Sequence, residues 1–600
     1  MQNFTLRKRD TLRITGIMLG SLAFTGCVDH DYDLSKDMDL NVTVGGESVY
    51  LPASSTGYLT VDNILDLSAG SSIRAISQQD IDNKENYGLA LGDYVLVQDA
   101  ADTHSSVNIE QITINDTDVN SEGITVPFAA GLSYTMPADF TSDISLSENN
   151  VDPCVKSAEQ AETDLELLFN IRYSSELYRG DITINKGYSI DFSEDWIVSI
   201  EDPTTATFAR MDNDHKLVFT SDVKVGYETP FAIRVKVNRF ILGSEKGEGL
   251  YEPGHFMLNS TIAFAGDVSI DDSTADHQIG DVDIDADIYI TKALILAITG
   301  VVDPEITIDD TLVRINDIPD FLSSDDNYLD LSDPQIYFTV DNQSPVSVTV
   351  TAKLTGIYSQ DKAPVNLYIG EWANQNGTEA IIVKPGLNKI CLSRTGENHG
   401  TGIVEVKVPN IGDLLTTIPS EIVISDIDMK VIQQPVTFVL SAPGESGYAF
   451  DAKYAAVVPL SFSNNMKLVY EDSDNGWDEE FEKYNFNTVE IKLDVLNTVP
   501  LTLVPDVEMT RADGSVLENL VIDIDGEVAA GSISSPSTSG LTIIARSKGE
   551  NLAGLNGIKY IFTAKSGQNT TGVVLNENQN LKFENIKITI KGGVTIDLND

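Results

Sequence analysis

The feature that most constrains this chain is an alternation of apolar and polar residues that recurs from about residue 40 to the end. Val346–Leu354 reads Val-Ser-Val-Thr-Val-Thr-Ala-Lys-Leu, and Val282–Ile290 alternates in the same way. A period of two places successive side chains on opposite faces of a strand, with one face buried. The pattern predicts an all-β protein. With 600 residues and 42% hydrophobic content, the chain is long and apolar enough for several β-domains with real cores.

An internal repeat indicates how two of these domains are built. Ile336–Val340 is followed by Asn342 and Pro345, and Ile491–Val495 is followed by Asn497 and Pro500, at a constant offset of 491 − 336 = 155 residues. Proline cannot donate to a strand ladder, and asparagine tolerates turn conformations, so the unit predicts strand, Asn-x-x-Pro corner, strand. Such corners occur in immunoglobulin-like sandwiches. The repeat therefore predicts two related β-sandwiches in the C-terminal half, separated near residue 445.

The predicted architecture is a multi-domain array of immunoglobulin-like β-sandwiches behind an N-terminal tether. The expected units are a signal peptide at 1–26, an acidic tether at 27–45, an N-terminal β-domain at 46–152, a β-domain at 153–300, a β-sandwich with the first corner at 301–445, and a C-terminal β-sandwich with the second corner at 446–600.

The last residues predict a hairpin. Ile586, Ile588 and Ile590 share one strand face, and Val594 begins a second alternating run. A register change of one residue would move every side chain to the other face. A three-residue loop at 591–593 pairs Ile590 with Val594 and aligns both apolar sets, so this loop is expected.

The first 26 residues have the features of a secretory signal. Arg7, Lys8, Arg9 and Arg13 precede a short apolar stretch, which ends at Thr25-Gly26-Cys27. This stretch has about 12 residues, whereas a helix that spans a membrane permanently needs about 20. Leu22–Cys27 resembles a lipobox, which implies lipidation of Cys27. The acidic residues that follow resemble the surface-export signal of Bacteroidota-type lipoproteins.

Charge excludes one class of partner. The net charge is −53. Removal of the signal, with four basic residues and one acidic residue, gives −53 − 4 + 1 = −56 for the mature chain. A field of this sign repels nucleic acid and makes divalent cations plausible partners. Cys154 and Cys391 have no CxxC neighbour, and either a disulfide or two buried thiols fits an exported chain.

Motifs for catalysis are missing from the sequence. It has no HExxH or HxH zinc spacing, no Gly-x-Ser-x-Gly elbow and no Walker loop. A glycosidase needs only two suitably placed carboxylates. That alternative stays open, but the expectation is a protein that is not an enzyme and has no cofactor.

Two acidic clusters are candidate cation sites. Asp281, Asp283, Asp285 and Asp287 alternate on one strand, which fits either a solvated sheet face or a cation. Asp472, Asp474 and Asp478 resemble half of a calcium loop, although Gly476 occupies a ligand position, and a plain acidic turn is the alternative.

Two tryptophans lie among polar neighbours. Trp372 and Trp477 could each stack on a sugar ring, or they could pack at a domain edge. Both possibilities stay open at this point.

The lipobox, acidic tether, corners and closing Gly-Gly-Val-Thr-Ile-Asp-Leu resemble large β-rich surface lipoproteins of Bacteroidota. The resemblance implies a non-catalytic lipoprotein, anchored in the outer membrane through its lipid and exposed on the cell surface, that presents or spaces a binding surface. One alternative is a glycan-binding accessory lipoprotein of a polysaccharide uptake system. Another is an adhesive or structural subunit that contacts a second surface protein.

Overall fold

The structure is a computed structural model of the whole chain. The structure describes residues 41–44, 48–52, 55, 57–62, 72–99, 102–129, 132–243, 249–271, 279–315, 327–358, 362–397, 399–475, 484–485, 487–511, 513–548, 555, 557–567, 569–591 and 594–597. Cys27 and the expected signal peptide lie outside these residues. No described helix is long and apolar enough to cross a membrane.

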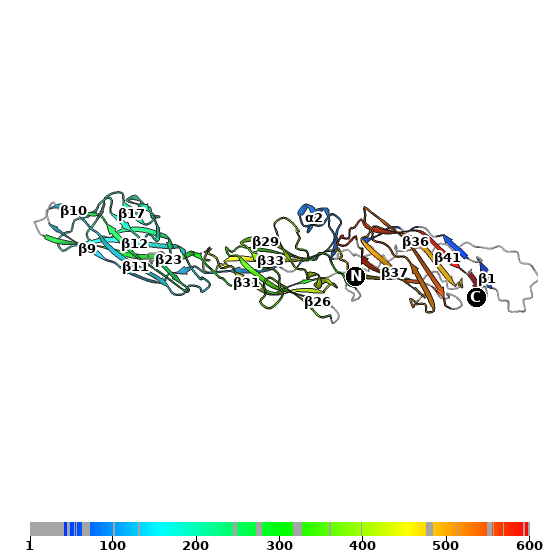
Figure 1. Cartoon of the computed structure of the whole chain (residues 1–600). Coiled ribbons are helices and arrows are strands. Elements are labelled where there is room, and N and C mark those ends of the chain that lie inside the picture. The colour runs from blue at the N-terminus through cyan, green and yellow to red at the C-terminus, as the bar shows by residue number, and fades with distance from the viewer. Residues whose placement is uncertain are drawn as a thin grey trace, which may run out of the picture.

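Three β-sandwiches lie end to end and form a rod (Figure 1). The expected all-β, multi-domain array of sandwiches is therefore confirmed. The distal sandwich is named for its place at the end of the rod opposite β1 (Asn41–Val44) (Figure 1). It contains β7 (Ile112–Thr113), β8 (Asp116–Asn120), β9 (Gly123–Ala129), β10 (Ser133–Pro137), β11 (Phe140–Glu148), β12 (Gln160–Ser174), β13 (Ile182–Ile184), β14 (Ser189–Asp191), β15 (Trp196–Ser199), η1 (Thr205–Thr207), β16 (Ala209–Asn213), β17 (Lys216–Phe219), β18 (Val223–Val225), β19 (Phe231–Ile241), β20 (Gly249–Glu252), β21 (His255–Ala265), β22 (Asp267–Asp271), β23 (Ile279–Gly300) and the returning β32 (Val436–Val439).

The other two sandwiches complete the rod. The middle sandwich contains β4 (Ile73–Ala75), α2 (Gln78–Asn83), β5 (Tyr94–Asp99), β6 (Thr103–Val107), β24 (Thr311–Arg314), β25 (Gln335–Asn342), β26 (Val348–Ile357), β27 (Val365–Ile369), β28 (Ile381–Val383), β29 (Gly386–Ser393), β30 (Ile403–Lys407), η3 (Ile411–Leu415), β31 (Glu421–Val431) and β33 (Tyr448–Pro459). The C-terminal sandwich contains β1 (Asn41–Val44), β2 (Ser48–Pro52), β3 (Leu59–Thr60), β34 (Lys467–Asn475), β35 (Tyr484–Asn485), β36 (Thr488–Asn497), β37 (Leu501–Thr510), β38 (Leu520–Asp525), β39 (Ser537–Ser547), β40 (Gly557–Ser566), β41 (Asn580–Lys591) and β42 (Val594–Asp597).

All three sandwiches are built on the same arrangement of strands, the frame, which has three neighbouring strands in each of two sheets. In the first sheet, β12 lies between β19 and β23, β25 between β29 and β33, and β36 between β39 and β41. In the second sheet, β21 lies between β11 and β14, β31 between β24 and β26, and β40 between β34 and β37. Every one of these pairings is antiparallel. The predicted two-fold repeat is thus part of a three-fold structural repeat.

The two predicted corners carry the chain from one sheet of a sandwich to the other. Asn342 Nδ2 donates to the carbonyl of Val346 (2.8 Å), and its Oδ1 accepts from Ser344 N–H (3.0 Å). Asn497 repeats this arrangement with Leu501 (3.1 Å) and Val499 (2.6 Å). Both asparagines are fully buried. The side-chain amide therefore replaces the strand ladder where the chain changes sheet.

An N-terminal strap, residues 41–129, runs along the whole rod and adds a strand to the last frame strand of each sandwich. β2 and β3 pair with β41, β5 and β6 pair with β33, and β9 and β7 pair with β23. Because the strap covers an edge that would otherwise expose unpaired backbone groups, it closes one side of all three first sheets.

The strap changes the division of the chain into domains. Residues 46–152 do not form a separate unit, because they are shared among all three sandwiches. The unit expected at 153–300 is incomplete, because the distal sandwich also includes the strands within residues 112–148. The unit expected at 301–445 ends too early, because the last frame strand of the middle sandwich, β33, begins at Tyr448. Part of the expected tether, 41–44, is strand β1, which pairs with β42.

The expected C-terminal hairpin is wrong for the same reason. β41 already pairs with β36 on one side and with β2 on the other, so both of its edges are occupied. β42 pairs instead with β1 and β35, and Val594 lies opposite Val44 rather than Ile590. Pairing with strands far away in the sequence therefore takes the place of the predicted pairing between β41 and β42.

The alternation prediction holds where one sheet face is buried. In β23, Val282, Ile284 and Ala286 are at most 1% exposed. The intervening aspartates face outward on the same strand. Buried apolar residues of the three sandwiches form one contiguous cluster that extends from Val61 to Leu581. The sandwiches are therefore joined through shared core contacts as well as through the strap.

Candidate functional site

The aspartates of β23 lie on a solvated sheet face with protein partners. Asp283 accepts a hydrogen bond from Thr125 Oγ1 (2.7 Å), and Asp287 lies 3.4 Å from Arg172 Nε. These contacts and the cross-strand spacing relieve the repulsion between neighbouring carboxylates. The arrangement fits the solvated-face alternative.

The second acidic cluster is extended rather than turned in its described part. Asp472 and Asp474 belong to strand β34, where their backbones pair with Tyr560 and Ile558. Their side chains, and the whole of Trp477 and Asp478, lie outside the described residues. The calcium hypothesis for this segment stays a prediction.

Trp372 packs at the edge of the middle sandwich. Its indole N–H donates to the carbonyl of Ile369 (2.9 Å), and its ring meets Tyr368 edge-on at 5.1 Å between centroids. The side chain is half-buried in the turn after β27. Its polar atom is therefore used inside the fold, while part of the ring faces solvent.

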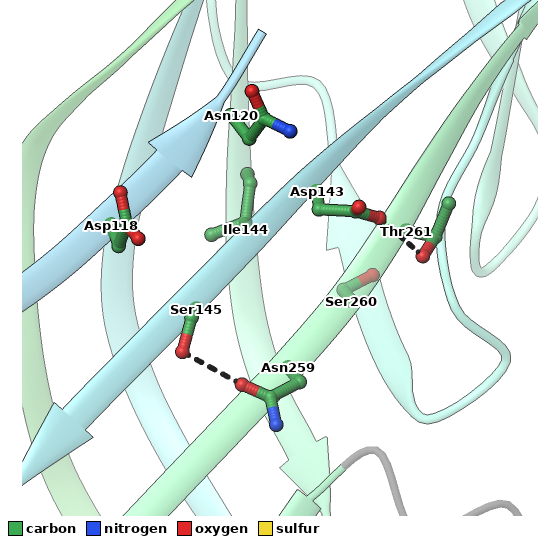
Figure 2. A pocket seen from close by; sticks show the side chains of 8 residues that line it. All are labelled: Asp118, Asn120, Asp143, Ile144, Ser145, Asn259, Ser260 and Thr261. Atoms are coloured by element: carbon green, nitrogen blue, oxygen red, sulfur yellow. Dashed lines mark hydrogen bonds between the residues drawn. The ribbon is translucent and has the colours of Figure 1, made fainter.

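A shallow polar depression of about 210 Å³ lies on the distal sandwich (Figure 2). Two cross-strand rows of side chains from β8, β11 and β21 form its floor: Asn120, Asp143 and Thr261 in one row, and Asp118, Ser145 and Asn259 in the other. Thr261 donates to Asp143 (2.6 Å) and Ser145 donates to Asn259 (2.8 Å). These side chains can hydrogen-bond a polar ligand, but much of their capacity is already used within the sheet.

The densest cluster of chemically reactive groups lies on the middle sandwich. Cys391 of β29 is directly paired with Glu405 on the parallel strand β30 and with Tyr337 on β25. His399 lies in the loop that joins β29 to β30. A sulfur, a nitrogen and an oxygen atom of Cys391, His399 and Glu405 lie within 4.8 Å of one another.

Both imidazole nitrogens of His399 face carboxylates. Nε2 lies 2.7 Å from Asp333 Oδ2, and Nδ1 lies 2.9 Å from Glu405 Oε2. Glu405 Oε1 also accepts from the backbone N–H of His399 (2.7 Å). The His399 side chain is only 8% exposed, so these contacts are largely shielded from water.

The environment sets the protonation of the cluster. Asp333, followed by Cys391, raises the pKa of His399 to about 11. Burial raises the pKa of the Cys391 thiol, although the imidazole acts in the opposite direction. The neighbouring carboxylate and thiol therefore favour the charged imidazole, whereas burial favours the neutral thiol.

The strap covers this cluster. Tyr87, which follows α2, lies with its ring centroid 5.4 Å from that of Tyr337. Ile76, Val95 and Val457 form a small separate core between the strap and the outer face of the sheet. Ser77 caps α2 together with Asp80, and Arg74 binds Asp80 at 2.8 Å.

Cys154 and Cys391 are both free and belong to different sandwiches, which selects the free-thiol alternative. The sequence search missed the cluster because His399 follows Cys391 by eight residues and precedes Glu405 by six, a spacing that matches none of the motifs considered. One signal in the sequence could have indicated the cluster. Cys391 and Glu405 lie on the two strands joined by a short connection, and His399 lies within that connection.

Comparisons with known proteins leave the function open. No family model and no curated protein matches the sequence. Among solved structures, a crystal structure of a predicted secreted protein from Parabacteroides distasonis ATCC 8503 is 16% identical. The alignment covers 49% of this chain and 83% of that one, with a TM-score of 0.35. A likeness at this level supports no assignment of function.

Proposed function

We propose that this chain is a non-catalytic lipoprotein of the outer membrane that acts as a rigid cell-surface spacer. A lipid on Cys27 holds the C-terminal sandwich next to the membrane. The distal sandwich then points away from the membrane and presents a binding surface. The lipobox and the acidic residues after it support the anchor and the export.

The observation that carries the proposal is the direction of the strap. The earliest described strand, β1, pairs with the last, β42, at one end of the rod, while β9 and β10 lie at the opposite end (Figure 1). An anchor upstream of β1 would therefore hold one end of the rod. The chain then crosses all three sandwiches before it returns.

Rigidity follows from how the sandwiches are joined. At the junction of the middle and C-terminal sandwiches, Tyr94 N–H donates to Leu575 (2.8 Å) and Gly572 N–H donates to Phe462 (2.9 Å). At the other junction, β32 leaves the middle sandwich and pairs with β23. Backbone hydrogen bonds that cross a junction oppose bending more strongly than a flexible linker would.

Two features support a non-catalytic role. The polar depression of the distal sandwich is shallow, and the histidine of the Cys391 cluster is held by two carboxylates. The glycan-binding and adhesive alternatives differ from the spacer in what the distal sandwich contacts. Both alternatives keep the lipid anchor on Cys27 and the orientation of the rod away from the membrane.

Mass spectrometry of the mature N-terminus and protease shaving of intact cells test the anchor and the exposure together. We expect a lipidated Cys27 and release of peptides from the distal sandwich without lysis. Cys27→Ala is the matched control and should give an unlipidated chain that is not retained in the membrane. Protection from protease in intact cells, with lysed cells fully digested, would place the protein on the periplasmic side and overturn the surface proposal.

A further inference from the structure

The cluster on the middle sandwich combines three kinds of donor atom that bind zinc in proteins. A buried thiol, an imidazole and a carboxylate lie within 4.8 Å of one another, with Cys391 and Glu405 fixed on adjacent strands. We propose that Cys391, His399 and Glu405 bind a zinc ion, which fastens the β29–β30 loop to the sheet beneath the strap.

The donor set selects the metal. Thiolate and imidazole favour zinc and other borderline metals, whereas calcium and magnesium take oxygen ligands. Zinc bonds of about 2.0 Å to nitrogen and 2.3 Å to sulfur place neighbouring ligand atoms roughly 3.3–3.5 Å apart. His399 Nδ1 and Glu405 Oε2, now 2.9 Å apart, need to separate by only a few tenths of an ångström.

Asp333 lies where an orienting carboxylate is expected. A zinc-bound histidine almost always donates its other ring N–H to a carboxylate, a carbonyl or water. His399 Nε2 faces Asp333 Oδ2 (2.7 Å), which leaves Nδ1 toward Glu405. Thr395 Oγ1 donates to Asp333 (3.1 Å), and Gln335 Nε2 does so at 3.2 Å. The outer carboxylate is therefore itself held in place.

The donor atoms of the cluster are largely shielded from water. Cys391 is fully buried, and the Glu405 and Asp333 side chains are 17% and 23% exposed. Three protein ligands leave a fourth position for water.

Metal analysis and cobalt spectroscopy of the full mature chain test the proposal. After gel filtration with a weak chelator, we expect about one zinc per chain. Cobalt should give a thiolate-to-metal charge-transfer band in the wild type. Cys391→Ser should abolish that band, His399→Gln should remove the bound zinc, and Asp333→Asn should weaken zinc binding by about 10–100-fold.

Cys154→Ser is the matched control, since it removes the other free thiol from a different sandwich, and it should keep both the zinc and the band. The wild-type cobalt spectrum keeps the test valid even if a variant fails to fold. No stoichiometric zinc and no thiolate band in the wild type would overturn the proposal. A band that survives in Cys391→Ser would overturn it as well.

Discussion

The middle and C-terminal sandwiches share a frame but differ in what lies on it. Both have the buried asparagine corner and a last strand closed by the strap. Among the described residues, α2 and the Cys391 cluster belong to the middle sandwich alone. The comparison teaches that the repeated corner residues build the sandwich, while residues that differ on the frame strands and in their connections carry the individual chemistry.

The largest effect should come from weakening the strap where it braces the middle sandwich. Leu96 of β5 is 1% exposed, and truncation of a buried leucine costs about 2–5 kcal/mol. Leu96→Ala should therefore speed hydrogen exchange in β33 while β41 of the C-terminal sandwich stays protected. Leu91→Ala, at a strap position that is 49% exposed, is the control and should change little. Equal loss of protection in β33 and β41 would show that the strap does not act on each sandwich separately.

The corners test whether the two frames are equivalent. Asn342→Ala and Asn497→Ala should each destabilise their own sandwich, by about 1–3 kcal/mol for every buried group left unpaired. Asn497 also donates to Ala529 (2.9 Å), so its loss additionally frees a second segment. Chemical denaturation measures both, with exposed Asn374→Ala as the control. An unchanged unfolding midpoint for either corner variant would contradict the shared role.

One pH effect should be measurable in the strap over the middle sandwich. Arg74 is the main cause that lowers the pKa of Asp80 from 3.8 to about 2. A lowered folded-state pKa gives stability that is present above pH 3.8 and is lost as the pH falls toward 2. Hydrogen exchange in 76–93 should therefore increase over this window, and Asp80→Asn should flatten the dependence. The same pH dependence in Asp80→Asn would assign the effect to other carboxylates.

The smallest effect should come from Trp372. An edge-on aromatic contact contributes about 0.5–1.5 kcal/mol, so Trp372→Ala should lower the stability of the middle sandwich slightly. Its indole N–H already donates to Ile369, so binding in a glycan-array screen should be the same for variant and wild type. Loss of a glycan signal without loss of stability would favour the glycan-binding alternative.

Local patterns predicted local structure well. The alternation at 346–354 and 282–290 corresponds to β26 and β23, because one face of each strand is buried. The Asn-x-x-Pro corners formed as expected, because their hydrogen bonds span only a few residues.

Long-range pairing was beyond the sequence. Nothing within 48–52 indicates a partner at 587–591. Because this pairing occupies an edge of β41, the predicted terminal hairpin does not form, and the domain boundaries differ from those predicted. The Cys391 cluster was hidden for a similar reason, since Asp333 reaches His399 across 66 residues. The capping box of Ser77 and Asp80 was a local signal, and it could have indicated α2.

The central claim is that the rod holds its distal sandwich away from the membrane, and lipid-to-protein energy transfer measures this directly. In a Cys154→Ser background, the lipidated chain carries a fluorophore at Leu132→Cys at the distal end or at Val516→Cys in the C-terminal sandwich; both positions are exposed. With acceptor lipids in the vesicle, we predict strong quenching at position 516 and little at position 132. Equal quenching at the two positions would mean that the rod lies flat on the membrane or bends freely, and the spacer account would be wrong.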